Sequence, residues 1–257
     1  MSGRARMILL ALAALTILPG FWRVAQSLPA FGTAASPYGE AINRLGPELR
    51  HVANMVSAVN FDFRGFDTLG EEYMLLCAVA GTVLLLRGAR GEDRAGHAGR
   101  VAGRPHEGRS DAIVLMSRIF GIFTLIFGAY VALHATATPG GGFQGGVIVA
   151  TGLLMLYLGE GYERWRKLIR PPVLDVCEGG GALLMVAGGL LPVTMGRPFL
   201  ENVLPFGTIK DMLSGGLMLV ENAGVALAVA GGFTVLMVEF LEETRALLSE
   251  VEQGQEP

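Results

Sequence analysis

Long apolar stretches alternate with polar segments along the chain. A bilayer core about 30 Å thick is crossed by about 20 mostly apolar residues in a helix. The pattern contains six such stretches, at about residues 7–25, 69–87, 112–133, 139–158, 172–192 and 215–240. It therefore predicts an all-α integral membrane protein with about six transmembrane helices.

The first apolar stretch follows Arg4 and Arg6, a pattern shared by membrane anchors and signal peptides. No A-x-A cleavage site follows it closely, so a retained anchor is favoured over a signal peptide. Loops on the side of the N-terminus hold about twice as many lysine and arginine residues as the opposite loops. This bias predicts that both termini lie in the cytoplasm, in a multi-pass protein of the inner (cytoplasmic) membrane.

Composition agrees with a membrane location. Charged residues make up 17% of the chain, against about 25% in a typical soluble protein. The net charge of −3 argues against nucleic-acid binding, which calls for a basic face. Cys77 and Cys177 both lie in apolar runs, so no disulfide or metal framework is implied.

A glycine-rich, charged segment divides the chain. Residues 88–110, "GARGEDRAGHAGRVAGRPHEGRS", are typical of a flexible linker. The expected organisation is a two-helix segment (1–87), the linker (88–110), a four-helix domain (111–241) and an acidic cytoplasmic tail (242–257).

The stretch "TPGGGFQGG", residues 138–146, has the G-x-G-x-x-G spacing of a dinucleotide-binding loop. That motif needs a short preceding strand and a soluble βαβ unit, whereas apolar spans flank this one, so nucleotide binding is rejected. We expect a helical hairpin in which Thr138 caps the following helix and Pro139 takes its first position. Turn formation and helix packing are expected of Pro139, Gly140, Gly141, Gly142, Gly145 and Gly146.

Ionisable residues inside spans are costly and mark pairing or ion pathways. Arg118 and Glu178 lie at equal depth from the cytoplasmic ends of their spans, and Asp175 is one turn nearer the water. Arg118 either pairs with Glu178 or extends to the headgroups without a partner. Glu221 is the most isolated carboxylate. It is a candidate proton or cation acceptor, or a neutral group bonded to a neighbouring helix or to a partner's lysine.

Polar residues also mark the outer ends of two spans. His134 closes the third span, where an interfacial histidine satisfied by water or backbone is favoured over a proton relay. Asp67, Glu71 and Glu72 begin the second span, where they either concentrate cations or form a solvated helix N-terminus. The chain has no Walker loop, H-E-x-x-H, G-x-S-x-G, C-x-x-C or haem motif, so no enzymatic activity or cofactor is predicted.

Two stretches resemble a known family. Residues from about 111 to 241, through "SRIFGIFTLIFGAYVALHATATPGGGFQGGVIVATGLLMLYL" and "LPFGTIKDMLSGG", resemble the B subunit of Mrp-type multisubunit Na⁺/H⁺ antiporters. They also resemble its counterpart in membrane-bound hydrogenases. Residues from about 7 to 87, through "NMVSAVNFDFRGFDTLGEE", resemble the C-terminal end of the large A subunit of the antiporters. The chain thus looks like a fusion of two neighbouring subunits.

The resemblance implies a membrane subunit of a monovalent cation/proton antiporter complex whose partners are other membrane subunits. The family pattern H-x-H-x-x-P-G-G-G-F has two histidines, but Thr136 replaces the second here, which argues against a paired histidine relay. Two alternatives stay open: the same module in a membrane-bound hydrogenase or related ferredoxin-linked complex, or a scaffold that carries no ions. Ion-pathway candidates are Asp67, Glu71, Arg118, His134, Asp175, Glu178 and Glu221.

Overall fold

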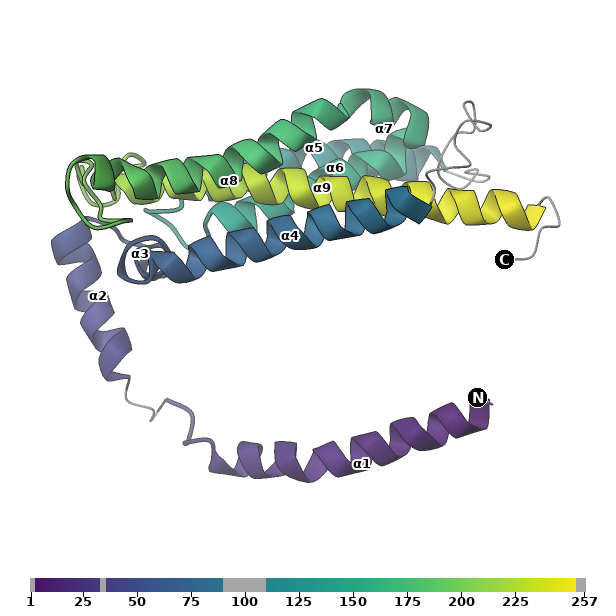
Figure 1. Cartoon of the computed structure of the whole chain (residues 1–257), viewed down its shortest axis with the longest axis horizontal. Coiled ribbons are helices and arrows are strands. Elements are labelled where there is room, and N and C mark those ends of the chain that lie inside the picture. The colour runs from purple at the N-terminus through teal and green to yellow at the C-terminus, as the bar shows by residue number, and fades with distance from the viewer. Residues whose placement is uncertain (1–2, 33–35, 90–109, 253–257) are drawn as a thin grey trace. The chain divides into compact units, whose positions relative to one another are not determined.

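The computed structural model describes residues 3–32, 36–89 and 110–252, with side chains at 4–32, 36–86 and 110–242. These residues form helices without any β-strand (Figure 1). The helices are α1 (Gly3–Ser27), α2 (Pro37–Arg50), α3 (Met55–Ala58), the π-helix η1 (Val59–Phe63), α4 (Gly65–Ala89), α5 (Asp111–Leu133), α6 (Gly142–Glu160), α7 (Tyr162–Leu168), α8 (Pro171–Thr194) and α9 (Leu217–Glu252).

Six helices are long and apolar enough to cross a membrane: α1, α4, α5, α6, α8 and α9. The predicted spans are therefore confirmed. The sequence pattern did not predict α2 and α7, because both are shorter and more polar than a span. The cytoplasmic orientation of the termini and the segment boundaries at 87, 110 and 241 stay predictions. Most of the proposed linker, residues 90–109, lies outside the described residues.

The chain forms two compact units, residues 1–41 and 42–257. In the first unit, α1 exposes apolar side chains all around its axis, among them Leu10, Phe21 and Trp22. A helix that is apolar on every side suits a lipid environment.

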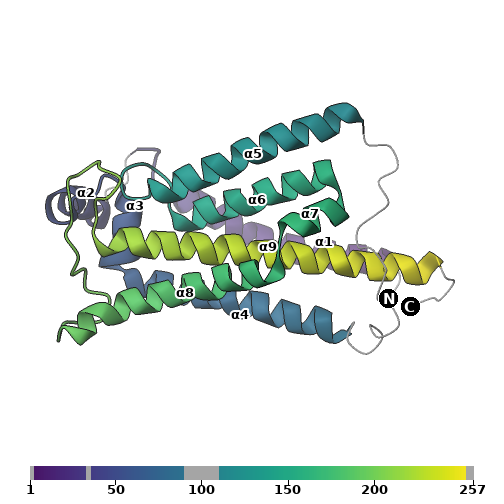
Figure 2. The same cartoon turned by 90° about the horizontal axis from the view of Figure 1, so that it is seen from above.

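In the second unit, α9 is the central helix, and α4, α6 and α8 pack against it (Figure 2). Small residues set these contacts. A Cβ on Gly181 of α8 would lie 2.3 Å from the carbonyl oxygen of Gly224 on α9. Between α5 and α6, a Cβ on Gly128 would lie 2.9 Å from the carbonyl oxygen of Gly145. Helices in lipid associate by close van der Waals packing, so these glycines favour the observed arrangement.

The end of the second unit that holds residues 134–141 is called the turn end below, and the opposite end is the α7 end. At the α7 end, the Trp165 indole donates a hydrogen bond of 2.6 Å to the Leu153 carbonyl. Tyr162 donates one of 2.7 Å to Glu242. Burial, followed by the bond to Glu242, raises the pKa of Tyr162 to about 12, so its phenol stays neutral.

Candidate functional site

The glycine turn is capped from a distant helix. α6 begins at Gly142, and Gly141 at its N-cap provides no side-chain bond. Instead, Asn222 of α9 accepts a hydrogen bond of 2.9 Å from the Gly142 N–H. The expected cap is therefore wrong: Thr138 lies before the helix and donates to the His134 carbonyl, and Pro139 is not the first helical residue.

The glycines after the turn lie against two different helices. A Cβ on Gly142 would lie 2.1 Å from the carbonyl oxygen of Asn222, and one on Gly146 would lie 2.8 Å from that of Ala226. Gly145 faces α5, where Ala132 lies within 2.7 Å of a Cβ. No side chain larger than hydrogen fits at these three positions, so the start of α6 is wedged between α5 and α9.

Asn54 attaches the N-terminal half of the chain to this turn. Its side-chain nitrogen lies 2.7, 3.0 and 2.9 Å from the carbonyl oxygens of Ala135, Thr138 and Gly140. The Ser57 hydroxyl donates a bond of 2.6 Å to the Ala135 carbonyl. Because these bonds satisfy buried carbonyls of an irregular segment, they fix its conformation. Sequence reasoning missed Asn54, since nothing local marks a partner about 80 residues away.

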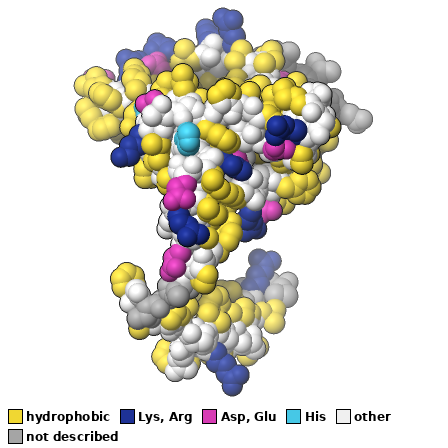
Figure 3. Space-filling model, turned by 90° about the vertical axis from the view of Figure 1, so that its left-hand side faces the viewer, with side chains coloured by type: hydrophobic (Ala, Val, Ile, Leu, Met, Phe, Trp, Pro, Cys, Tyr) yellow, Lys and Arg dark blue, Asp and Glu magenta, His cyan; other side chains and the backbone are white. Residues whose placement is uncertain are grey.

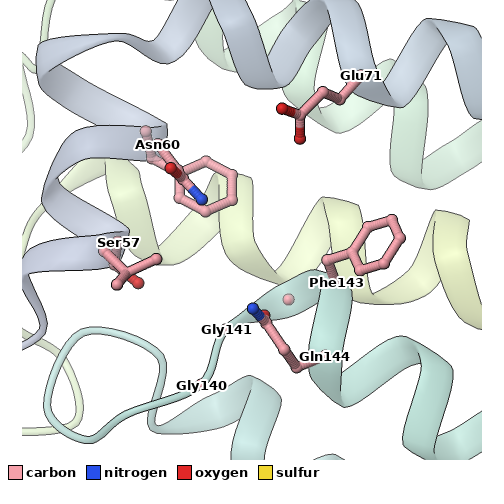
Figure 4. A pocket seen from close by; sticks show the side chains of 10 residues that line it. Ser57, Asn60, Glu71, Gly140, Gly141, Phe143 and Gln144 are labelled. Atoms are coloured by element: carbon pink, nitrogen blue, oxygen red, sulfur yellow. The ribbon is translucent and has the colours of Figure 1, made fainter. Parts of the chain in front are cut away.

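A cavity of about 160 Å³ lies within the second unit, between residues 56–71 and the glycine turn (Figure 4). The labelled Glu71 extends from α4 toward it, and Gln144 approaches from the first turn of α6. Its lining includes Ser57, Asn60, Phe61, Glu71, Gly140, Gly141, Gly142, Phe143 and Gln144. The cavity therefore combines a carboxylate, amide and hydroxyl groups, and the backbone of the glycine turn.

Asp67 does not line this cavity. It forms an ion pair with Arg64 at the first turn of α4, where both side chains are about half exposed. An acidic residue in the first turn also suits the helix dipole. Of the two alternatives that the sequence left open for Asp67, this position agrees with the solvated helix N-terminus.

Arg118 pairs with Glu160 and not with Glu178. Its Nε lies 2.5 Å from Oε1 of Glu160, and its NH2 nitrogen lies 3.2 Å from Oε2. Arg164 also reaches Glu160, at 3.6 Å. The Arg118–Glu178 pair considered from equal depth does not form, because depth does not determine the direction in which a side chain leaves its helix.

His134 and Thr136 complete the turn end. The His134 ring stacks on Tyr130 with centroids 4.1 Å apart, and its Nδ1 lies 3.0 Å from the Tyr130 carbonyl. Thr136 is fully buried, and its hydroxyl lies 3.3 Å from that of Ser214. These contacts of His134 and Thr136 stabilise the loop between α5 and α6.

The remaining predicted acids lie deeper. Glu221 is fully buried, and neither carboxylate oxygen has a hydrogen-bond partner among the described residues. It lies beside Gly188 of α8, where a Cβ would be 3.8 Å from Oε1. Glu178 lies against Gly232 of α9 and also buries an unbonded Oε1, whereas Asp175 is exposed. The predicted acids therefore do not form one cluster.

Two acids that were not among the ion-pathway candidates also have notable surroundings. Glu72, next to the exposed Glu71, is only 4% exposed. Asp62 in η1 lies 2.7 Å from Arg50 and 3.3 Å from the Asn202 amide, and the Arg50 guanidinium lies over the Phe63 and Phe206 rings. The sequence did not single out Asp62, although it lies in the stretch "NMVSAVNFDFRGFDTLGEE", because its partners Arg50 and Asn202 are distant or outside that stretch.

Arg50 and Asp62 line a second cavity of about 330 Å³ at the turn end, together with Phe63, Arg64, Gly65, Phe66, Phe199, Leu200, Glu201 and Asn202. This end of the unit carries charged and histidine side chains among apolar ones (Figure 3). Among the described residues, no group of His, Cys, Asp and Glu has the arrangement of a metal site.

Two known proteins are similar to this chain in sequence. The chain is 28% identical over 214 residues to a probable K⁺/H⁺ antiporter A/B subunit of Rhizobium meliloti (strain 1021); the match covers 74% of this chain and 21% of that protein. It therefore spans about a fifth of that relative. It is 28% identical over 144 residues to a Na⁺/H⁺ antiporter B subunit of Bacillus subtilis (strain 168), covering 54% of this chain and 98% of that protein.

Two solved structures match most of the chain. A chain of the archaeal membrane-bound sulfane sulfur reductase has a TM-score of 0.72 at 27% identity, with 91% of this chain and 99% of that chain covered. A chain of the Mrp complex from Dietzia sp. DQ12-45-1b has a TM-score of 0.73 at 22% identity, with 95% and 27% covered, and shares the fold.

Residues 112–235 match the family model described as a domain related to the MnhB subunit of Na⁺/H⁺ antiporter. They comprise α5, α6, α7, α8 and the first half of α9, including the glycine turn. The chain is thus a multi-pass membrane protein, and its residues 112–235 match the MnhB-related family model.

Proposed function

We propose that the chain is a membrane subunit of a multisubunit monovalent cation/proton antiporter and binds other membrane subunits of that complex. The MnhB-related domain and the similarity to antiporter subunits of two bacteria support this function. One of these relatives is named for K⁺ and the other for Na⁺, so we assign a monovalent cation without choosing between them. We assign no enzymatic reaction to the chain.

The cavity beside the glycine turn is the observation that carries the proposal. Ser57, Asn60 and Glu71 line it from the segment before the MnhB-related domain, and Phe143 and Gln144 line it from that domain. A carboxylate with neighbouring amide oxygens is suited to binding a small cation or a proton. We propose that Glu71 takes part in ion translocation there, while Asp67, Arg118 and His134 hold helix ends.

Ion exchange in everted membrane vesicles tests this assignment. The complex is expressed with wild-type chain, Glu71→Gln, Asp67→Asn or the control Glu163→Gln, which changes an exposed carboxylate of α7. Proton efflux is followed with a pH-sensitive dye after addition of NaCl or KCl. We expect at least a tenfold loss in Glu71→Gln, little change in Asp67→Asn and none in the control. Wild-type exchange in Glu71→Gln with normal assembly would contradict the assignment and favour a scaffold.

A second candidate is a membrane subunit of a respiratory complex. The sulfane sulfur reductase match supports it, because this chain covers 99% of the matching chain. In such a complex, redox chemistry in other subunits drives ion movement. The identity of the partner subunits distinguishes the two candidates, since the chain itself is compatible with both.

A further inference from the structure

Three acidic side chains in the interior of the second unit lack a balancing charge. Glu221 is 0% exposed, Glu72 is 4% exposed, and Glu178 buries an unbonded Oε1. Within the described part of the chain, none of the three has a hydrogen bond or an ion pair with a basic residue. Burying an unpaired carboxylate is costly, so these positions call for a function.

The three acids occupy successive depths. α4 and α9 run in the same direction from the turn end (Figures 1 and 2). A Cβ on Gly232 of α9 would lie 3.1 Å from Val79 Cγ2 of α4 and 3.5 Å from Glu178 Oε1 of α8. Gly232, Val79 and the Glu178 carboxylate therefore lie at the same depth along the helix axes. At 1.5 Å per residue, Glu221 lies about 16 Å before that level along α9, and Glu72 lies about 10 Å before it along α4. Glu72 is therefore between Glu221 and Glu178, about 6 Å deeper than Glu221.

Further acids stand at both ends of this series. At the turn end, Asn202 joins Asp62 to the start of α9: its amide nitrogen lies 3.3 Å from Asp62, and its oxygen accepts a bond of 2.9 Å from the Leu217 N–H. Glu221 follows Leu217 by one helical turn, and Asp62 lines the 330 Å³ cavity. Toward the α7 end, the exposed Asp175 precedes Glu178 by three residues in α8, which runs opposite to α9.

The surroundings favour a proton over a metal cation as the species bound. Metal cations such as Na⁺ need several oxygen ligands, but the Glu221 oxygens have no polar partner within bonding distance among the described residues. Glu221 shares its face of α9 with the buried Met218 and Val225. A single proton neutralises such a carboxylate and needs no further ligands. The acids that interact electrostatically with these groups are Asp62 for Glu221, Glu178 for Glu72 and Asp175 for Glu178.

We propose that Asp62, Glu221, Glu72, Glu178 and Asp175 form a proton relay through this chain, separate from the Glu71 cavity. In each step the O–H bond of one carboxylic acid breaks and a new O–H bond forms on the next carboxylate. Side-chain rotation and transient waters connect these acids, whose depths along the helix axes differ by about 6 and 10 Å. The relay rests on the proposed function, since it provides a route for the exchanged proton.

Two measurements on the intact complex test the relay. The first is exchange in vesicles with Glu221→Gln, Glu72→Gln or Glu178→Gln and the exposed control Glu163→Gln, with assembly checked by co-purification. We expect at least a tenfold loss of proton flux in each of the three variants, with normal assembly, and none in the control. A variant that assembles and exchanges at the wild-type rate would overturn the relay.

The second measurement is labelling of the wild-type complex with dicyclohexylcarbodiimide, which reacts with protonated carboxyl groups in apolar surroundings. Peptide mass spectrometry at neutral pH is expected to find an adduct on Glu221 and none on Glu163. Absence of the Glu221 adduct would overturn the relay, even where a variant fails to assemble. A wild-type complex that exchanges no cation would contradict the proposed function, and labelling would then still decide whether the buried acids hold protons.

Discussion

Asn222 links two helices at the turn end. Its side-chain oxygen caps α6 at Gly142, and its nitrogen donates a bond of 2.8 Å to the Met218 carbonyl of its own helix. The residue is fully buried, so both bonds form away from water. It therefore joins the start of the MnhB-related hairpin to the central helix.

Replacing Asn222 with alanine should destabilise the protein by about 1–2 kcal/mol, because the Gly142 N–H loses its acceptor in a buried site. Thermal unfolding of the purified complex measures the change. Asn222→Asp retains an acceptor oxygen and should lose less. Equal melting temperatures for wild type and Asn222→Ala would show that the cap has no effect on stability.

Residue-scale features were the hardest to predict. The sequence identified Glu221 and Glu178 as buried acids, because charge inside an apolar span is visible in the chain. It assigned the α6 cap to Thr138 and considered Glu178 as a partner of Arg118. Those two assignments depend on which residues of distant helices meet, and the rotation of each helix about its axis is absent from a hydropathy pattern.

At the scale of elements, close helix packing depends on the glycines of α6. Gly142→Ala should disrupt assembly, because its Cβ would overlap the backbone of Asn222 at 2.1 Å and backbone cannot rotate away. Gly179→Ala in α8 is the matched control, since a Cβ there meets nothing within 4 Å. Gel filtration measures the yield of folded complex for each of the two variants. Similar yields would contradict the packing argument.

The spans were predictable from the sequence alone, since each needs only about 20 apolar residues in succession. Their boundaries were not. α4 begins at Gly65, before its apolar run, because η1 and the Asn54 cap of α3 lead the chain directly into it. α6 begins at Gly142, after Pro139, because its cap comes from α9.

For the whole molecule, the charge bias predicts both termini in the cytoplasm. Fusions of alkaline phosphatase, active outside, and of green fluorescent protein, fluorescent inside, report the location of each end. We expect fluorescence and no phosphatase activity at both termini. Phosphatase activity at the N-terminus alone would mean that α1 does not cross the membrane as proposed.

We propose that this chain works as a subunit of a cation/proton antiporter complex. Affinity purification of the tagged chain from native membranes in mild detergent, with mass spectrometry of the bound proteins, tests it most directly. We expect large antiporter-like membrane subunits to co-purify without redox subunits. Iron–sulfur or nickel–iron proteins among the partners would place the chain in a respiratory complex instead, and a chain that purifies alone would contradict the claim.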